Sequence, residues 1–387
     1  MKQNSNYNFQ QGLNALKQGK FNSAENHFRS LLEAEPNHPE INHNLGITLY
    51  KLNRFEEAEK LYKKAIKLKP DYVSAFYNLG CLLNDAGRYD EAEKFYKTTI
   101  TLNQKFTMAH NNLGNTLKAL GRFDEAELSY KKAIELKNDY AEAYANIGGL
   151  FTDIGKLEEA ELSYRKAIEL KPSLTEINNS LDIVLRFKKL SSIIFSQKEN
   201  RIKTKAITNK GLLNNPYISK RDVEPELINT LYKIDLMDLD QTKNGDARYG
   251  KGKCSDFKLF QNNFALIKKV ERDLISIMSK AVKSEIYIMD SFFNILRTKS
   301  GTTPHKHIHY FDVRKGLVNK KFSLTYYLSV GDQNCKEPGN LKVYDPEEEI
   351  KVSKGKIVII PANRVHSSVY DGKTDRIMIG VNFYSLT

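Results

Sequence analysis

Four of the eight histidines lie in the C-terminal part of the chain, at spacings that suit a metal site. His305, His307 and His309 alternate along one short stretch, and His366 follows further along. On a strand, residues at i and i+2 point to the same face about 6.6–7 Å apart, a separation that two imidazoles can bridge through one metal. Residues at i and i+4 stand about 13 Å apart, at the limit of that reach. We therefore expect His307 to be one ligand, with either His305 or His309 as its partner.

The residues around these histidines have the pattern of short antiparallel strands. Within residues 216–387, helical periodicity is found at 225–234 and 262–281. From Ile286 onward, apolar and aromatic runs alternate with Gly, Pro and Asp, which predicts an antiparallel sandwich or jelly roll with flanking helices. The expected strands are 286–297, 322–330, 342–344, 349–352, 356–360 and 376–384.

The order of motifs in this half is His-x-His, a strand, Gly339-Asn340-Leu341, residues 355–361, His366 and then Arg376. This order resembles the Fe(II)/2-oxoglutarate-dependent oxygenase superfamily, particularly its prolyl-hydroxylase-like branch, over residues 286–387 and more weakly from 215. The resemblance implies a mostly β double-stranded β-helix (jelly roll) that binds Fe(II) and takes 2-oxoglutarate as cosubstrate. It also implies an oxidative activity, in which 2-oxoglutarate and dioxygen yield succinate and carbon dioxide while a carbon–hydrogen bond is hydroxylated.

Carried over by position, the resemblance assigns a role to each motif residue. His305 matches the first histidine, His307 the carboxylate position, His366 the distal histidine and Arg376 the cosubstrate anchor. Neutral imidazoles suit Fe(II), and three protein ligands leave three octahedral positions open. A guanidinium offers a planar fork that matches a carboxylate, a geometry that lysine lacks. His309 is the alternative to His305, or else lies outside the ligand set.

Further contacts to the cosubstrate are expected from Tyr326, Tyr327 or Asn382. His307 departs from the family, in which most members have Asp or Glu, so three neutral ligands would leave the site one unit more positive. Two alternatives follow from this departure. One is a three-histidine, cupin-like iron dioxygenase that does not use 2-oxoglutarate, and the other is a non-catalytic interaction scaffold whose jelly roll has lost its chemistry.

The first half of the chain repeats every 34 residues. Small residues, aromatics and most of the closing prolines recur at this interval, which resembles the tetratricopeptide repeat. Two helices in each unit approach closely only where Gly and Ala face each other, and stacked units share one core. The recurring residues are Gly12, Gly46, Gly80, Gly114 and Gly148; Ala24, Ala58, Ala92, Ala126 and Ala160; and Phe28, Tyr62, Tyr96, Tyr130 and Tyr164.

A row of amides accompanies the repeat glycines, two residues before each: Asn44, Asn78, Asn112 and Asn146, with Gln10 in the first unit. The row is similar to the asparagine ladder in the repeats of the protein O-GlcNAc transferases, which holds an extended peptide. An amide both donates and accepts, so it can bind a peptide bond whatever the side chain. The alternative is that these asparagines belong to the repeat consensus and only cap or solvate the helices.

These patterns divide the chain into residues 1–190 (five repeats and a capping helix over 174–190), a linker over 191–215 and the oxygenase-like domain over 216–387. We expect a protein or peptide partner in the repeat groove, presented to the iron as substrate, or a small-molecule substrate with the repeats recruiting the enzyme to a complex.

Charge and cysteine content bear on the remaining partners and on location. The net charge of +13 arises mainly after residue 190, where 33 Lys and Arg stand against 22 Asp and Glu. The basic residues are spread without interleaved aromatics, which does not favour a nucleic-acid partner. Apolar runs are too short for a membrane span, no secretory signal is visible, and Cys81, Cys254 and Cys335 are too scattered for a disulfide framework. We expect a cytoplasmic protein.

Overall fold

A computed structural model describes residues 2–201, 215–234, 237–238, 250–255, 257–308, 310–336 and 338–386. The chain divides into two compact units, Met1–Val184 and Leu185–Thr387, and each is described by itself. None of the helices in these described ranges combines the length and the apolarity that crossing a membrane requires.

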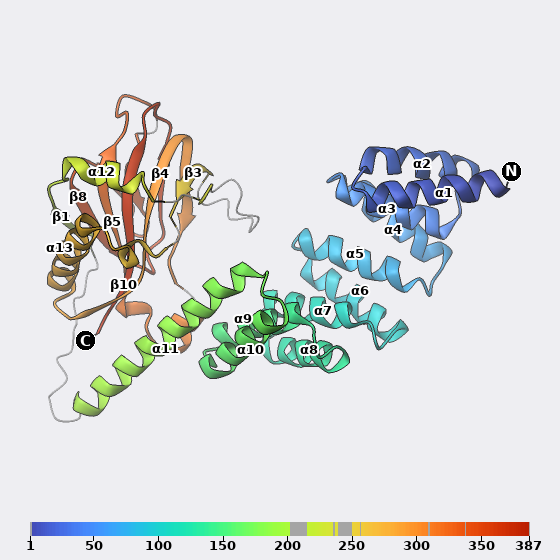
Figure 1. Cartoon of the computed structure of the whole chain (residues 1–387), viewed down its shortest axis with the longest axis horizontal. Helices are drawn as coiled ribbons and strands as arrows, with labels where there is room; N and C mark the ends of the chain where they lie inside the picture. Colours follow the sequence, from blue (N-terminus) through green and yellow to red (C-terminus); the bar gives the residue numbers. More distant parts are fainter. Residues whose placement is uncertain are drawn as a thin grey trace. The chain divides into compact units, whose positions relative to one another are not determined.

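The first unit is a series of antiparallel helix pairs (Figure 1). The inner helix of each pair is α1 (Lys2–Lys17), α3 (Pro39–Lys51), α5 (Val73–Asp85), α7 (Thr107–Ala119) or α9 (Ala141–Asp153). The outer helix is α2 (Phe21–Ala34), α4 (Phe55–Leu68), α6 (Tyr89–Leu102), α8 (Phe123–Leu136) or α10 (Leu157–Leu170). The prediction of five helical repeats is confirmed.

The repeat glycines are required by close packing within each pair. A Cβ added at Gly114 would lie 2.6 Å from the ring of Tyr130, and one at Gly46 would lie 2.8 Å from the ring of Tyr62. The corresponding glycine and aromatic residue meet in the same way in the other three repeats. The aromatic ring therefore occupies the space that a side chain would take, which explains why the two residue types recur together.

Helix α11 (Thr175–Arg201) follows the fifth pair. It contains the capping helix that was predicted over 174–190, but it continues to Arg201. The linker prediction is therefore wrong for residues 191–201, where the Lys- and Ser-containing sequence is helical. Residues 202–214 of the predicted linker lie outside the described residues.

The second unit is built from antiparallel strands, with two of its helices packed on one face of the sheet. Its strands are β1 (Tyr217–Lys220), β2 (Met237–Asp238), β3 (Gly250–Cys254), β4 (Ile286–His305), β5 (Lys321–Val330), β6 (Leu341–Val343), β7 (Glu348–Ile350), β8 (Lys356–Pro361), β9 (His366–Tyr370) and β10 (Arg376–Ser385). Hydrogen-bonded neighbours follow the order β1-β8-β5-β10-β4-β9-β6-β7, with β3 on β4 and β2 on β3. The helices are α12 (Pro225–Leu231), α13 (Ala265–Val282) and the short α14 (Tyr310–Arg314). The predicted strand-rich region and both longer helices are confirmed.

The long strand β4 belongs to two groups of strands. Its residues 286–296 pair with β10, and its residues 300–305 pair with β9. One face of the β1-β8-β5-β10-β4 group packs under α12 and α13, with Leu274, Phe293 and Ile379 fully buried in that core (Figure 1). The opposite face packs against the β9-β6-β7 group, where Val343 and Tyr370 are buried. The side chains between the two groups of strands form this second core, which contains the candidate site.

Candidate functional site

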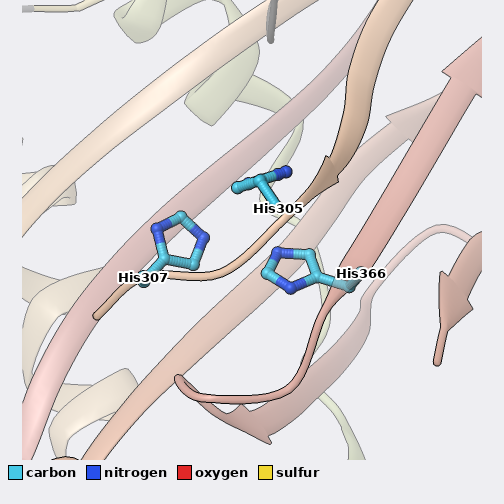
Figure 2. Close-up of side chains that lie close together, drawn as sticks. All are labelled: His305, His307 and His366. Atoms are coloured by element: carbon cyan, nitrogen blue, oxygen red, sulfur yellow. The ribbon is translucent and has the colours of Figure 1, made fainter. Parts of the chain in front are cut away.

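Three of the predicted histidines converge on one point. The ligand atoms of His305, His307 and His366 all lie within 4.8 Å of one another. Their ring centroids are 4.5–5.1 Å apart, and Figure 2 shows the three imidazoles turned toward a common space. Within the described ranges, no carboxylate joins this group. His309, the alternative to His305, lies outside the described residues.

Strand pairing brings the histidines together from distant parts of the sequence. His305 ends β4 and His366 begins β9, and the two residues are direct cross-strand partners. His307 follows β4, where its backbone N–H donates to the carbonyl of Ala362 at 2.9 Å. His305 and His307 therefore reach the same space although His307 has already left the strand, so the i, i+2 argument predicted the pair but not its backbone geometry.

The tautomer of His366 leaves one ring nitrogen for a ligand. Its Nδ1 lies 3.2 Å from the carbonyl oxygen of Arg364, which can only accept, so Nδ1 carries the proton. Burial and, to a smaller extent, the neighbouring His305 lower the pKa of His366 to about 4, so the ring is neutral near pH 7. A neutral imidazole whose Nδ1–H is held by a carbonyl presents the lone pair of Nε2, the form in which histidine binds metals.

Gly301 allows β4 and β9 to approach each other beside the histidines. It has φ +143°, and an added Cβ would lie 2.1 Å from the carbonyl oxygen of Ser368. No other residue type fits this position without moving β9, which carries His366. The glycine thus supports the cross-strand pairing of the two histidines from four residues away.

Arg376 is a buried cation with unused hydrogen-bond donors. It begins β10, is fully buried, and its guanidinium lies 5.0 Å from the ring centroid of Tyr327 and 6.0 Å from that of Tyr370. Nη1 donates to the carbonyl of Gly339, whereas Nε and Nη2 have no partner in the described structure. Burial lowers the pKa of Arg376, but a guanidinium keeps its charge in proteins. This arrangement suits an anion with a planar pair of oxygens.

The Gly339 carbonyl connects this cation to the strand of the distal histidine. It accepts from Ser368 Oγ at 2.9 Å as well as from Arg376, and Ser368 follows His366 by two residues on β9. Gly339 has φ +81°, and a Cβ there would overlap Nη1 of Arg376 at 1.4 Å. The Gly339-Asn340-Leu341 motif therefore contributes a carbonyl and a space that the guanidinium fills.

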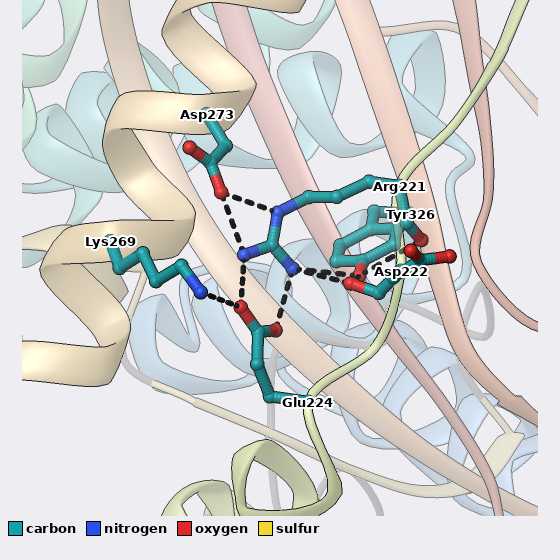
Figure 3. Close-up of polar contacts among 6 residues, drawn as sticks. All are labelled: Arg221, Asp222, Glu224, Lys269, Asp273 and Tyr326. Carbon is teal, nitrogen blue, oxygen red and sulfur yellow. Dashed lines mark hydrogen bonds and ion pairs between the residues drawn. The ribbon is translucent and has the colours of Figure 1, made fainter.

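The three alternative residues for a further cosubstrate contact have different environments. Tyr327 lies under the guanidinium, and burial raises the pKa of its hydroxyl. Tyr326 points to the opposite face of β5, where its hydroxyl donates to the carbonyl of Asp222 at 3.0 Å and accepts from Arg221 (Figure 3). The inclusion of Tyr326 is therefore wrong, because successive residues of a strand face opposite sides.

Asn382 lies further along β10, among buried polar groups that the sequence did not single out. Its Nδ2 donates to Asp290 at 2.8 Å, and its Oδ1 has no partner in the described structure. Burial raises the pKa of Asp290 to about 6. Asp312, which is also fully buried, accepts from Lys321 at 2.9 Å and from Tyr384 at 2.5 Å. Asn382 and Tyr384 belong to β10, whereas Asp290, Asp312 and Lys321 come from β4, α14 and β5, so no local sequence pattern indicates this cluster.

The asparagines of the repeats link neighbouring inner helices. Asn78 Nδ2 lies 2.8 Å from Nε2 of His43, and Asn146 Nδ2 donates to Oδ1 of Asn111 at 3.0 Å. Asn112 Nδ2 donates in the same way to the hydroxyl of Tyr77, whereas Asn44 bonds within its own helix, to the carbonyl of Glu40. Three of the four amides are therefore oriented by the preceding repeat and do not act as helix caps.

Comparison with known proteins identifies the first unit. Tetratricopeptide repeat models match residues 15–80, 73–106 and 141–174, and a TPR repeat model matches 114–155. The N-terminal region consists of tetratricopeptide repeats. Because arrays of these repeats form extended concave binding surfaces, this region is a protein-interaction scaffold.

Several solved structures are similar to the tetratricopeptide part of the chain. A crystal structure of MamA has 27% sequence identity and a TM-score of 0.39, covering 43% of this chain and 96% of that one. TTC0263, described as a thermophilic TPR protein in Thermus thermophilus, has 23% identity and a TM-score of 0.40, covering 47% and 98%. YrrB, described as a TPR protein with an unusual peptide-binding site, has 20% identity and a TM-score of 0.39, covering 45% and 89%. No curated protein matches the sequence.

Proposed function

We propose that the second unit is a jelly-roll, Fe(II)- and 2-oxoglutarate-dependent oxygenase that hydroxylates a substrate delivered or recruited by the tetratricopeptide repeats. The observation that carries this proposal is the presence of two complementary sites in one core. The ligand atoms of His305, His307 and His366 converge on one point, and Arg376 offers unpaired, buried N–H groups.

The histidines fit an iron ion. Each supplies one ring nitrogen, and their ligand atoms are close enough for a single ion to contact all three. Imidazole is a suitable donor for Fe(II), and three ligands leave coordination positions for substrates. When bound, the iron and 2-oxoglutarate together would supply the oxidising power for hydroxylation, and the protein would provide orientation and a dry pocket.

The guanidinium fits the distal carboxylate of 2-oxoglutarate. Nε and Nη2 lie on one edge of the group and can donate two parallel hydrogen bonds, while Nη1 stays on Gly339. Tyr327 supports the guanidinium from below. A dianionic cosubstrate would also compensate the buried positive charge, which costs several kcal/mol when it is left unpaired.

The substrate of this site is a protein or peptide held in the repeat groove. Alternatively, it is a small molecule, and the repeats recruit the enzyme to a protein complex. Asn78, Asn112 and Asn146 favour the peptide, because each donates one N–H to the preceding helix and its Oδ1 can accept from a ligand. Asn112 Oδ1 already accepts from Asn111 at 3.2 Å, so only its second lone pair is available. Each such hydrogen bond contributes about 0.5–1.5 kcal/mol, so the row would give weak docking that works as a tether.

The test is metal content and succinate release by the purified full-length protein. With Fe(II), 2-oxoglutarate and dioxygen, the wild-type protein should bind about one iron per chain, and it should release succinate even without added substrate. His366→Ala should abolish both signals. Iron binding with oxygen consumption but no need for 2-oxoglutarate would favour the three-histidine dioxygenase. Absence of iron binding would favour the non-catalytic scaffold.

A further inference from the structure

The tetratricopeptide array contains a cavity beside Asn146, the last residue of the asparagine row. The cavity has a volume of about 280 Å³ and is lined by residues of α7, α8, α9 and α10 and by the first turns of α11. Asn146 and Gly149 of α9 form part of its wall, facing Lys118 of α7 and Glu176 of α11. Pockets for small molecules usually measure about 300–1,000 Å³, so this cavity matches a single side chain better than a whole cofactor.

The cavity coincides with a break in the repeat pattern. The residue after each repeat glycine is Leu13, Ile47, Cys81 and Asn115 in the first four units, but it is Gly149 in the fifth. A Cβ added at Gly149 would lie 3.3 Å from Nζ of Lys118 and 3.4 Å from the hydroxyl of Tyr164. Both of those residues line the cavity, so a longer side chain at position 149 would extend into it.

The lining favours a positively charged guest. The positive charge of Lys118 is balanced by an ion pair, because its Nζ lies 2.8 Å from a carboxylate oxygen of Asp153. Glu176 makes no ion pair within the described ranges, so it leaves one negative charge at the rim. The hydroxyl of Tyr130 donates to Asn115 at 2.7 Å and therefore presents its oxygen as an acceptor.

Asn146 connects this cavity to peptide binding. Its Nδ2 is used by Asn111 of the preceding inner helix, which leaves Oδ1 to accept a peptide N–H at the cavity wall. A peptide that follows the asparagine row would thus bring one side chain to the cavity.

We propose that this cavity, named here the fifth-repeat pocket, binds the ammonium or guanidinium of a Lys or Arg side chain in the peptide partner. The inference rests on the proposed peptide binding by the repeat groove. It adds a specificity to that binding: the asparagines hold the backbone of any extended peptide, and the fifth-repeat pocket selects a basic residue at one position.

The test is binding of short, capped Ser/Ala peptides that differ only in one central guest residue. The guests are Lys, Arg, Gln, Leu and Glu, each labelled and titrated with the full-length protein by fluorescence anisotropy. The wild-type protein should bind the Lys and Arg guests about tenfold more tightly than the Gln guest, the ratio expected for one charge-assisted hydrogen bond. This preference should weaken at high salt, because Glu176 is exposed.

Variants separate the pocket from the asparagine row. Gly149→Ile should fill the pocket and Glu176→Gln should remove its charge, so each should bind all guests alike. Asn112→Ala should weaken every guest by a similar factor and keep the basic preference. The controls are Leu162→Ala and Glu169→Gln on α10, at side chains that are 69% and 67% exposed, and both should behave like the wild-type protein.

The outcomes distinguish the pocket from the groove. Peptide binding with no preference for basic guests, or a preference that survives in Gly149→Ile, would overturn the fifth-repeat pocket and leave groove binding intact. Absence of binding by any guest would overturn both. Circular dichroism melting of Gly149→Ile, compared with that of the wild-type protein, shows whether a lost preference reflects the pocket or the fold.

Discussion

At the scale of single residues, the informative feature is a buried cation with two unpaired hydrogen-bond donors. Arg376 is fully buried, and two of its donor atoms contact no acceptor in the described structure. Buried charges are normally paired, and an unpaired one costs several kcal/mol. An anionic ligand that accepts from both donors would remove this cost, which supports the proposal that Arg376 binds the cosubstrate carboxylate.

Replacing Arg376 tests this reasoning directly. Arg376→Lys keeps the charge but loses the planar fork, so the KM for 2-oxoglutarate should rise about 10- to 100-fold, corresponding to ~1.5–3 kcal/mol. Steady-state succinate release measures the change. Arg272→Lys, at an exposed position on α13, is the matched control and should leave the KM unchanged.

A substitution beside Arg376 should also weaken 2-oxoglutarate binding while the arginine itself is kept. Gly339→Ala would introduce a Cβ where Nη1 of Arg376 lies, so it should also raise the KM for 2-oxoglutarate while iron binding by the histidines persists. Normal 2-oxoglutarate kinetics in both variants would show that Arg376 does not hold the cosubstrate.

At the scale of elements, buried polar groups fix how neighbouring segments join. His43 of α3 is buried and bonds to Tyr72 and to Asn78 of α5 at 3.0 and 2.8 Å. In the second unit, Arg221 bonds to Glu224, Asp273 and the hydroxyl of Tyr326, which joins the segment before α12 to α13 and β5 (Figure 3). Both contacts give predictions about stability.

Acid should weaken the α3–α5 interface through His43. Burial lowers the pKa of His43 to about 4, below its ordinary value of 6.5. Between these values the unfolded chain binds a proton that the folded chain does not, so stability falls as pH drops from about 6.5 to 4, by roughly 3 kcal/mol at most. Thermal unfolding across this pH range measures the loss. Tyr77 is found at the same position of the next repeat, so tyrosine fits this place in the array. His43→Tyr should remove this part of the pH dependence, because the new side chain does not titrate between pH 4 and 6.5.

Removing Arg221 should destabilise the second unit. Its side chain is 8% exposed, and it holds the pKa of Glu224 down to about 2. Arg221→Ala would leave Glu224 and the hydroxyl of Tyr326 without this partner, at a cost of about 3 kcal/mol in the free energy of unfolding. Denaturant unfolding measures it. Lys269→Met, which removes a 55% exposed partner of the same Glu224, should cost less than ~1 kcal/mol, and equal losses in the two variants would contradict this account.

At the scale of the whole molecule, the proposed peptide binding and the proposed chemistry belong to different units. The asparagine row and the fifth-repeat pocket lie in Met1–Val184, and the histidines and Arg376 lie in Leu185–Thr387. Each set belongs to a unit with its own fold, so substitutions in one unit should leave the local chemistry of the other intact.

This division predicts that peptide binding and iron-dependent succinate release can be lost independently of each other. The combined variant Asn78→Ala, Asn112→Ala and Asn146→Ala should lose peptide binding but keep its iron content and its substrate-independent succinate release. His366→Ala should show the reverse. Iron analysis, succinate assays and anisotropy on the same preparations measure both properties, and a fall in iron content in the asparagine variant would contradict the separation.

Periodic features of the fold could be predicted from the sequence, because their causes are local. A glycine and an aromatic residue recur every 34 residues because each helix pair needs the same close approach, and the repeats follow from that pattern alone. Type and spacing could select His307 with either His305 or His309, and the family resemblance added His366 and favoured His305.

Only the tertiary structure decided how these residues meet. Strand β9 and the extension of β4 to His305 escaped prediction, because Gly301 and the short, polar run after His366 do not have a strand pattern. Their pairing depends on contacts between residues distant in sequence, as does the opposite orientation of Tyr326 and Tyr327. Burial likewise depends on the whole fold, so the two unpaired donors of Arg376 and the cavity at Gly149 could be found only once the surrounding elements were in place.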